Sequence, residues 1–268
     1  MKPVVGRTEN SFATAERKGI GSAIVIANSQ TLMPIGVGTA QEKRRNLFMV
    51  AASDSPYNLP IYPRMYRASK HDSVLFVSTY HELLHWYPDW KFGEAILDSA
   101  LDAYAIYEML EHYDVSAIID LNPRRSKKFT YNEMNINLDG VPVCPIGRKM
   151  FDWGVDRKRY RRKWQCPAAV GKWQCPNPCS TTTYGRTFYT STKDNPRLFP
   201  RVKRNSKEWY KRYSLRTGVE RCIKRQKIDY HLEDSRGCSS RHWSIRAYSI
   251  GMCFRFKTFW IVGSELAF

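Results

Sequence analysis

The chain has 268 residues, of which 43 are Lys or Arg and 25 are Asp or Glu, so its formal net charge is +18. A hydrophobic content of 43% with 13% aromatic residues excludes a disordered chain and allows one sizeable core. No apolar run is long enough for a membrane-spanning helix, and the first residues lack the pattern of a secretory signal. We therefore expect no membrane partner, and the charge makes a polyanion, DNA or RNA, the leading partner.

Regular patterns begin at Leu47 and predict an α/β layer. The apolar runs 47–52 and 59–62 predict two short buried strands, and a helix is predicted from Asp72 or Ser73 to Pro88. Residues 95–97 predict a strand that leads into Asp98, followed by a helix over 102–112 and a strand over 115–121. This alternation with short connections favours adjacent, parallel strands.

The second half of the chain has a different pattern. Residues 127–205 hold short alternating pieces, many prolines and four of the seven cysteines, which predicts a β-rich insertion. Helical periodicity then predicts one helix from Ser206 to Lys227 and another from Ser239 to Trp260. The expected division is therefore 1–46 as an atypical segment, 47–126 as the first part of the core, 127–205 as the insertion, and 206–262 as the C-terminal helical part carrying Glu220.

The insertion contains a basic run in which cations alternate with aromatic rings, D-R-K-R-Y-R-R-K-W from Asp156 to Trp164. This composition suits phosphate contacts combined with base or sugar stacking. The candidate DNA-binding cations are Arg157, Lys158, Arg159, Arg161, Arg162 and Lys163. The alternative is a solvated charged face.

Four polar residues are spaced to lie on one stripe of the predicted helix 206–227, because about 3.6 residues make one helical turn. They are Tyr213, Arg216, Glu220 and Lys227. Such a stripe is either a surface ladder of ion pairs or a metal-binding carboxylate whose neighbours grip phosphates. Asp98 follows a predicted strand, where α/β sheets place reactive groups, although Asp98 or Asp102 could equally cap the next helix.

The same residues resemble a known family. The spacing Y-x2-R-x3-E-x6-K is the signature of a large group of bacterial insertion-sequence DDE transposases, and it is matched at all four positions. L-D-S-A-L-D-A-Y, with Asp98 and Asp102, is similar to the family's second-aspartate motif. A-S-K-H-D-S at 68–73 and the stretch 219–235 also resemble this family, so the resemblance covers about 47–260.

The resemblance implies a ribonuclease H-like mixed sheet flanked by helices, with the β-rich insertion before the last catalytic helix. It implies that two Asp and one Glu hold Mg²⁺ or Mn²⁺, which suits hard oxygen ligands and in-line phosphodiester displacement. Asp98 would be the second acid and Glu220 the third. Tyr213, Arg216 and Lys227 would position the transposon-end DNA.

The family further implies double-stranded DNA as partner, both terminal repeats and target, a homodimer on DNA, and a bacterial cytoplasmic location near the nucleoid. Two other functions stay open. One is a catalytically inactive DNA-binding remnant, and the other is a ribonuclease H-like nuclease without strand transfer.

The family's first aspartate should precede Leu47, but no acid there fits, and Asp54 and Asp72 lie at a turn and a helix start. One codon assignment for residues 30–43, translated from its third base, encodes D-P-D-A-N-W-G-W-D-S-S-R-K, which resembles family members at this point. We hypothesise that much of the segment before Leu47 is an out-of-frame or truncated remnant. We then expect that segment to be disordered and catalysis to be impaired, since a metal ligand is missing.

The insertion also holds Cys144, Cys166, Cys175 and Cys179 at spacings C-x21-C-x8-C-x3-C. Four thiolates in one segment could form a structural Zn²⁺ site. The spacing lacks the usual close pairs, so free or loosely clustered thiols are the alternative.

Overall fold

A computed structural model describes residues 23–31, 46–53, 57–67, 72–124, 129–156, 158–234 and 239–265. The chain divides into two compact units. The first unit comprises 1–98 and 213–268, and the second unit comprises 99–212. The expected insertion, 127–205, therefore falls within the second unit.

The first unit is built on a mixed sheet. Its strands are β1 (Ala23–Thr31), β2 (Asn46–Ser53), β3 (Pro60–Arg67) and β4 (Glu94–Leu97), in the order β3-β2-β1-β4. β2 is antiparallel to both β1 and β3, whereas β1 and β4 are parallel. The strands predicted at 47–52, 59–62 and 95–97 are confirmed, and so is the α/β class.

Strand β4 is short and ends in three apolar residues, Ala95, Ile96 and Leu97. All three are fully buried. A continuous apolar run is typical of a parallel strand that is covered on both faces. The parallel register pairs Ile26 of β1 with Leu97 of β4, so the next residues along the two strands are Ala27 and Asp98.

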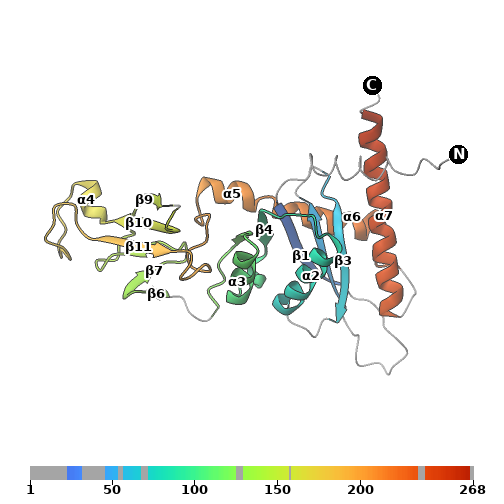
Figure 1. The fold of residues 1–268 in the computed structure, drawn as a ribbon, viewed down its shortest axis with the longest axis horizontal. Helices are drawn as coiled ribbons and strands as arrows, with labels where there is room; N and C mark the ends of the chain where they lie inside the picture. Colours follow the sequence, from blue (N-terminus) through green and yellow to red (C-terminus); the bar gives the residue numbers. More distant parts are fainter. Residues whose placement is uncertain are drawn as a thin grey trace. The chain divides into compact units, whose positions relative to one another are not determined.

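The described part of the first unit also holds the helices α2 (Asp72–Trp86), α6 (Arg216–Ile228) and α7 (Ser240–Glu265). α6 packs against β1 and β2, whereas α2 and α7 pack against β3. Figure 1 shows the long helix α7 running beside β3. In the part of the chain that is described, no helix combines the length and the apolarity needed to cross a membrane.

The helix predicted over 206–227 is wrong as a single element, because it is two helices, α5 (Lys207–Tyr213) and α6. Between them the Thr217 amide bonds to the Ser214 carbonyl and the Gly218 amide to the Leu215 carbonyl. These i to i−3 bonds form a tight turn instead of a continuous α-helix. The predicted helix 239–260 is confirmed and extends to Glu265.

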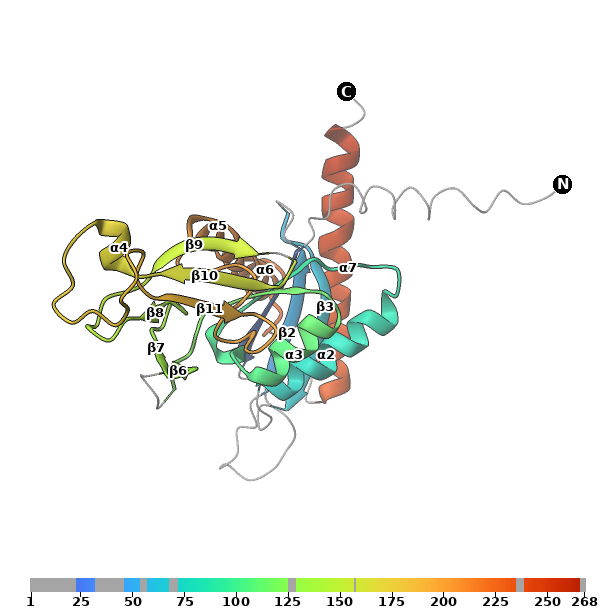
Figure 2. The same ribbon diagram turned by 60° about the vertical axis from the view of Figure 1, so that its left-hand side comes forward.

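The second unit begins with a short 3₁₀ turn, η1 (Ser99–Leu101), then α3 (Tyr104–His112) and β5 (Ser116–Ile119). Strands β6 (Phe129–Tyr131), β7 (Met134–Ile136) and β8 (Pro142–Val143) form one antiparallel sheet. Strands β9 (Phe151–Asp156), β10 (Arg161–Gln165) and β11 (Thr187–Ser191) form another (Figure 2). The short helix α4 (Pro167–Gly171) follows β10.

The segment 1–46, expected to be disordered or out of frame, contains β1. Residues 23–31 form this strand between β2 and β4, which departs from the expectation for these nine residues. Apart from Asn46, which begins β2, the remainder of the segment lies outside the described residues.

Candidate functional site

Asp98 and Glu220 both belong to the first unit. Asp98 directly follows the C-terminal end of β4, and Glu220 lies in the second turn of α6, the helix that packs across β1 and β2. Since β1 is the neighbour of β4, the sheet brings the end of β4 and α6 to the same region of the unit.

Arg216 binds one of the two carboxylates, that of Glu220, directly. Its Nη1 donates a hydrogen bond of 2.6 Å to Oε1 of Glu220. Burial alone would lower the pKa of the Arg216 guanidinium, but the negative charges of Glu220, then Tyr213 and Asp98, raise that pKa above its ordinary value. Among these influences on the Arg216 pKa, that of Asp98 is the smallest.

This arrangement bears on the two interpretations of the stripe. The Arg216–Glu220 pair has the i, i+4 spacing of a surface ladder, and Glu220 is half exposed. A ladder confined to one helix would not include a carboxylate from the end of β4. The ladder interpretation therefore accounts for Arg216 and Glu220 but not for Asp98.

The other two residues of the stripe occupy different positions. Tyr213 is the last residue of α5, and the Arg216 guanidinium lies 5.7 Å from its ring centroid. Lys227 lies near the end of α6, and its Nζ is 2.8 Å from Oε1 of Glu233. The expectation that all four share one helix is therefore wrong for Tyr213, because the chain turns at Ser214.

The residue types of Asp98 and Glu220 are those that a magnesium ion takes as ligands. Mg²⁺ takes oxygen ligands and is commonly held through one or two carboxylates together with substrate phosphates. Asp98 and Glu220 supply two such carboxylates. Among the described residues, no group of three or more His, Cys, Asp or Glu is gathered as a metal centre.

The transposase resemblance implies a further acid on a strand before β2, and β1 is the described strand in that position. The nine residues of β1 read A-I-V-I-A-N-S-Q-T and contain neither Asp nor Glu. Asp54, one of the two acids weighed for this role, lies outside the described residues, and Asp72 is the first residue of α2. The first aspartate that the transposase resemblance implies is therefore not found on β1.

Asp102, the other acid of the L-D-S-A-L-D motif, is fully buried in the second unit. Its carboxylate accepts hydrogen bonds from the Tyr107 hydroxyl, at 2.9 Å, and from the Asn122 amide, at 2.8 Å. Arg197 adds Nε and Nη2 bonds of 3.1 and 2.7 Å. The alternative of capping α3 is wrong, since its N-cap residue is Ala103 without a side-chain cap.

The buried guanidinium of Arg204 extends this cluster. Its Nη2 donates to the Tyr107 hydroxyl and to the Arg197 carbonyl, both at 2.8 Å, and its Nε donates to the Ile119 carbonyl at 3.0 Å. Burial raises the pKa of the Tyr107 phenol, so Tyr107 stays a neutral donor to Asp102. Asp102 therefore has a structural role that the motif did not reveal.

The predicted basic run forms the β9–β10 turn and strand β10. Lys158 and Arg159 lie exposed in the turn, Arg161, Arg162 and Lys163 are on β10, and Arg157 lies outside the described residues. Arg162 forms an ion pair of 2.6 Å with Asp152, and Arg161 lies 3.5 Å from Asp156. The run thus divides between the two faces of the sheet.

The four predicted zinc ligands are separated into two environments. Cys144 is buried in the apolar core of the second unit, together with Trp164 and Phe188. Cys166, Cys175 and Cys179 line one cavity of about 330 Å³ beside α4. All four are free thiols. The structural zinc site therefore stays a prediction.

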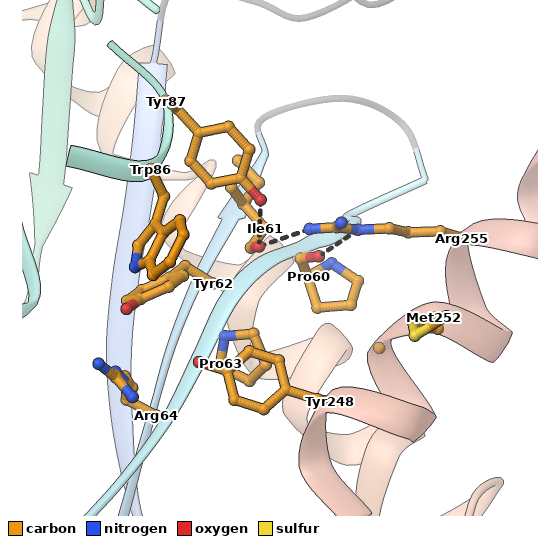
Figure 3. Close-up of a pocket in the computed structure, with 11 residues that line it drawn as sticks. Pro60, Ile61, Tyr62, Pro63, Arg64, Trp86, Tyr87, Tyr248, Met252 and Arg255 are labelled. Carbon is orange, nitrogen blue, oxygen red and sulfur yellow. Dashed lines mark hydrogen bonds between the residues drawn. The ribbon is translucent and has the colours of Figure 1, made fainter. Parts of the chain in front are cut away.

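A separate cavity of about 380 Å³ lies in the first unit, between β3, the end of α2 and α7 (Figure 3). Its polar groups are engaged by the protein. Arg255 of α7 donates to the Pro60 and Ile61 carbonyls of β3, and the Tyr87 hydroxyl also donates to Ile61. Arg64 Nε donates to Glu82 of α2 at 2.6 Å. The Arg255 hydrogen bonds join α7 to β3, and the Arg64–Glu82 bond joins α2 to the same strand.

We expect Arg255→Ala to lower the free energy of unfolding by about 1.5–3 kcal/mol. Hydrogen bonds from a charged donor contribute this much to stability, and the substitution leaves two backbone carbonyls without their donor. Thermal and urea unfolding of the full chain measure the change. Lys257→Ala is the matched control, since Lys257 is an exposed cation on the same helix, and it should shift stability by less than about 0.5 kcal/mol. Equal stability of the two variants would contradict the role of Arg255.

No protein-family model matches the chain, and a search of curated proteins finds no match. The transposase resemblance therefore remains a prediction that rests on the motifs and on the site geometry. Sequence reasoning did not single out Trp153 and Tyr189, which are exposed beside the basic strand β10. The sequence feature that could have identified them is the alternation of residues in F-D-W on β9 and F-Y-T on β11, which is typical of strands.

Proposed function

We propose that this protein is a DDE transposase-like protein that acts on DNA at insertion-sequence ends and whose strand cleavage and transfer are impaired. The observation that supports the proposal is the placement of the two acids within the first unit: Asp98 follows β4, whose neighbour β1 packs against α6, the helix on which Glu220 accepts a 2.6 Å hydrogen bond from Arg216. The strand order β3-β2-β1-β4, antiparallel and then parallel, supports a ribonuclease H-like core around them. The net charge of +18 supports a nucleic-acid substrate.

In this proposal Asp98 and Glu220 hold Mg²⁺ or Mn²⁺. A bound ion would stabilise the oxygens of a phosphodiester during in-line displacement. Arg216 keeps Glu220 oriented before DNA arrives, and its guanidinium can then pair with a phosphate, for which its donors are well shaped. Tyr213 and Lys227 flank this position from the end of α5 and from the C-terminal turn of α6.

A second candidate is a catalytically inactive DNA-binding remnant. It is favoured by one observation, the absence of any acid in β1. The test is incubation of the full chain with supercoiled plasmid carrying terminal repeats, with Mg²⁺, with Mn²⁺ and with EDTA. Metal-dependent nicking, even if slow, supports the impaired enzyme, whereas DNA binding without any nicking supports the remnant. Joined products would exclude a nuclease without strand transfer.

We expect Ala27→Asp to raise metal-dependent nicking by at least about tenfold, because the register brings residue 27 level with Asp98 and a third carboxylate there would complete the ligand set. Asn28→Asp is the matched control. It adds the same charge at the next residue of β1, which the register does not bring level with Asp98. Equal activity of the two variants would show that the new carboxylate does not act beside Asp98.

A further inference from the structure

The sheet β9-β10-β11 of the second unit has one buried face and one open face. Side chains alternate between the faces along each strand. Trp164 and Phe188, which are register partners, are buried with Thr190, and the Trp164 Nε1 donates to the Thr190 hydroxyl at 2.9 Å. The other face, which we call the open face, carries Phe151, Trp153, Arg161, Lys163 and Tyr189. It also carries Gln165, the register partner of Phe151, and Asp156, which pairs with Arg161 at 3.5 Å.

The open face exposes three aromatic rings. Trp153 is 57% exposed, Phe151 49% and Tyr189 41%. The Phe151 and Trp153 rings are 6.4 Å apart on β9, and Tyr189 lies on β11, so the rings flank the central strand β10 on both sides. Large rings gathered on one solvent-facing surface usually mark a binding site.

A β-bulge places Trp153 on this face. Lys163 pairs with Gly154, but the next residue, Trp164, pairs with Asp152, so Trp153 is the extra residue without a partner. Gly154 adopts φ +127, a conformation that L side chains rarely take. Bulges redirect side chains in this way and are common at functional sites.

Cations occupy the strand between the rings. Lys163 is the register partner of Tyr189, and its Nζ lies 5.9 Å from the Trp153 ring centroid. The Arg161 guanidinium lies 4.6 Å from the Tyr189 ring centroid. Within the described part of the chain, Lys163 forms no ion pair with an acid, so its charge is open to an anion.

We propose that the open face binds single-stranded nucleic acid, with unpaired bases stacked on Trp153, Phe151 and Tyr189 and with phosphates held by Lys163 and Arg161. Every base has a π face, and rings combined with cations are what recognition of unpaired strands requires. A duplex buries its base faces and offers only phosphates and groove edges. The inference goes beyond the proposed strand cleavage, because it names the form of nucleic acid that the second unit takes.

The test is fluorescence anisotropy of a labelled fifteen-nucleotide single strand, and of a duplex of the same length, with the full chain in EDTA. We expect Trp153→Ala to weaken single-strand binding about 5- to 150-fold, the range for one stacked base, and duplex binding less than about threefold. Trp153→Phe should keep most of the affinity. Trp260→Ala, which removes a ring that is 79% exposed in the first unit, should change binding less than about twofold.

Single-strand binding is measured at several salt concentrations, and log K is plotted against the logarithm of the salt concentration. Lys163→Ala should make the slope of this plot less steep by about 0.7, the contribution of one phosphate contact. The proposal is overturned if the Trp153→Ala variant, with unchanged circular dichroism, binds the single strand as well as the parent chain, or if both DNA forms lose affinity equally. An absence of single-strand binding, which would leave the open face to a protein partner, also overturns it. Because EDTA removes the metal, failure of strand cleavage leaves this result unaffected.

Discussion

Asp98→Asn should reduce metal-dependent DNA nicking by at least about a hundredfold. The substitution keeps the size of the side chain but removes the negative charge that a hard cation requires, and an amide is a far weaker ligand for Mg²⁺ than a carboxylate. Glu220→Gln should have the same effect, because the proposal assigns the two acids to one ion. Nicking of supercoiled plasmid in Mn²⁺ measures both variants.

Asp229→Asn provides the matched control for these variants. Asp229 follows the end of α6, is half exposed, and lies 3.7 Å from Arg225, so it is a carboxylate in an ion pair at one helix, as Glu220 is. Its loss should leave nicking within about twofold. If Asp98→Asn nicks as fast as the parent chain, the two acids do not share an ion, and the transposase-like site is wrong.

The second large effect is expected from Asp102→Asn, which should destabilise the second unit by about 3–5 kcal/mol. The substitution leaves the Arg197 guanidinium, 17% exposed, without its counter-ion, and it turns an acceptor into a partial donor against Asn122 and Tyr107. Removing one partner of a buried pair has this cost because the other charge stays desolvated.

Amide hydrogen exchange of β5 measures this loss within the second unit, where protection should fall by a factor of about a hundred or more. Asp114→Asn is the control, since Asp114 also pairs with an arginine, Arg201 at 2.7 Å, but is 87% exposed. An exposed pair is worth at most about 1 kcal/mol. Similar protection in the two variants would contradict the structural role of Asp102.

Local elements were predictable where a single segment carries its own signal. The alternation of strand and helix from Leu47 to Leu121 was recognised because apolar spacing and turn residues decide it locally. The break at Ser214 was not predicted, since periodicity runs through it and only two i to i−3 bonds mark the turn. β1 was not predicted either, because a sheet can recruit a segment with weak strand character when neighbours supply its hydrogen bonds.

The candidate site was predictable only in part, because spacing along the chain identifies residues but not their tertiary contacts. The motif spacing singled out Asp98, Glu220 and Arg216, and the structure shows the bond between the last two. The same motif treated Asp98 and Asp102 alike, although Asp98 follows β4 in the first unit and Asp102 is buried against Arg197 in the second. Four residues of separation cannot distinguish them, because burial depends on segments about a hundred residues away.

The amino-acid sequence alone determined the charge of the chain, the α/β class, most element positions and the residue types available for metal and phosphate. Those properties follow from composition and from spacing along the chain. Only the tertiary structure decided which groups face each other: Asp102 faces Arg197, and the rings of β9 and β11 lie on either side of Lys163. Such juxtapositions depend on strand register, on one bulge and on helix packing, which act between distant segments and leave no local signal.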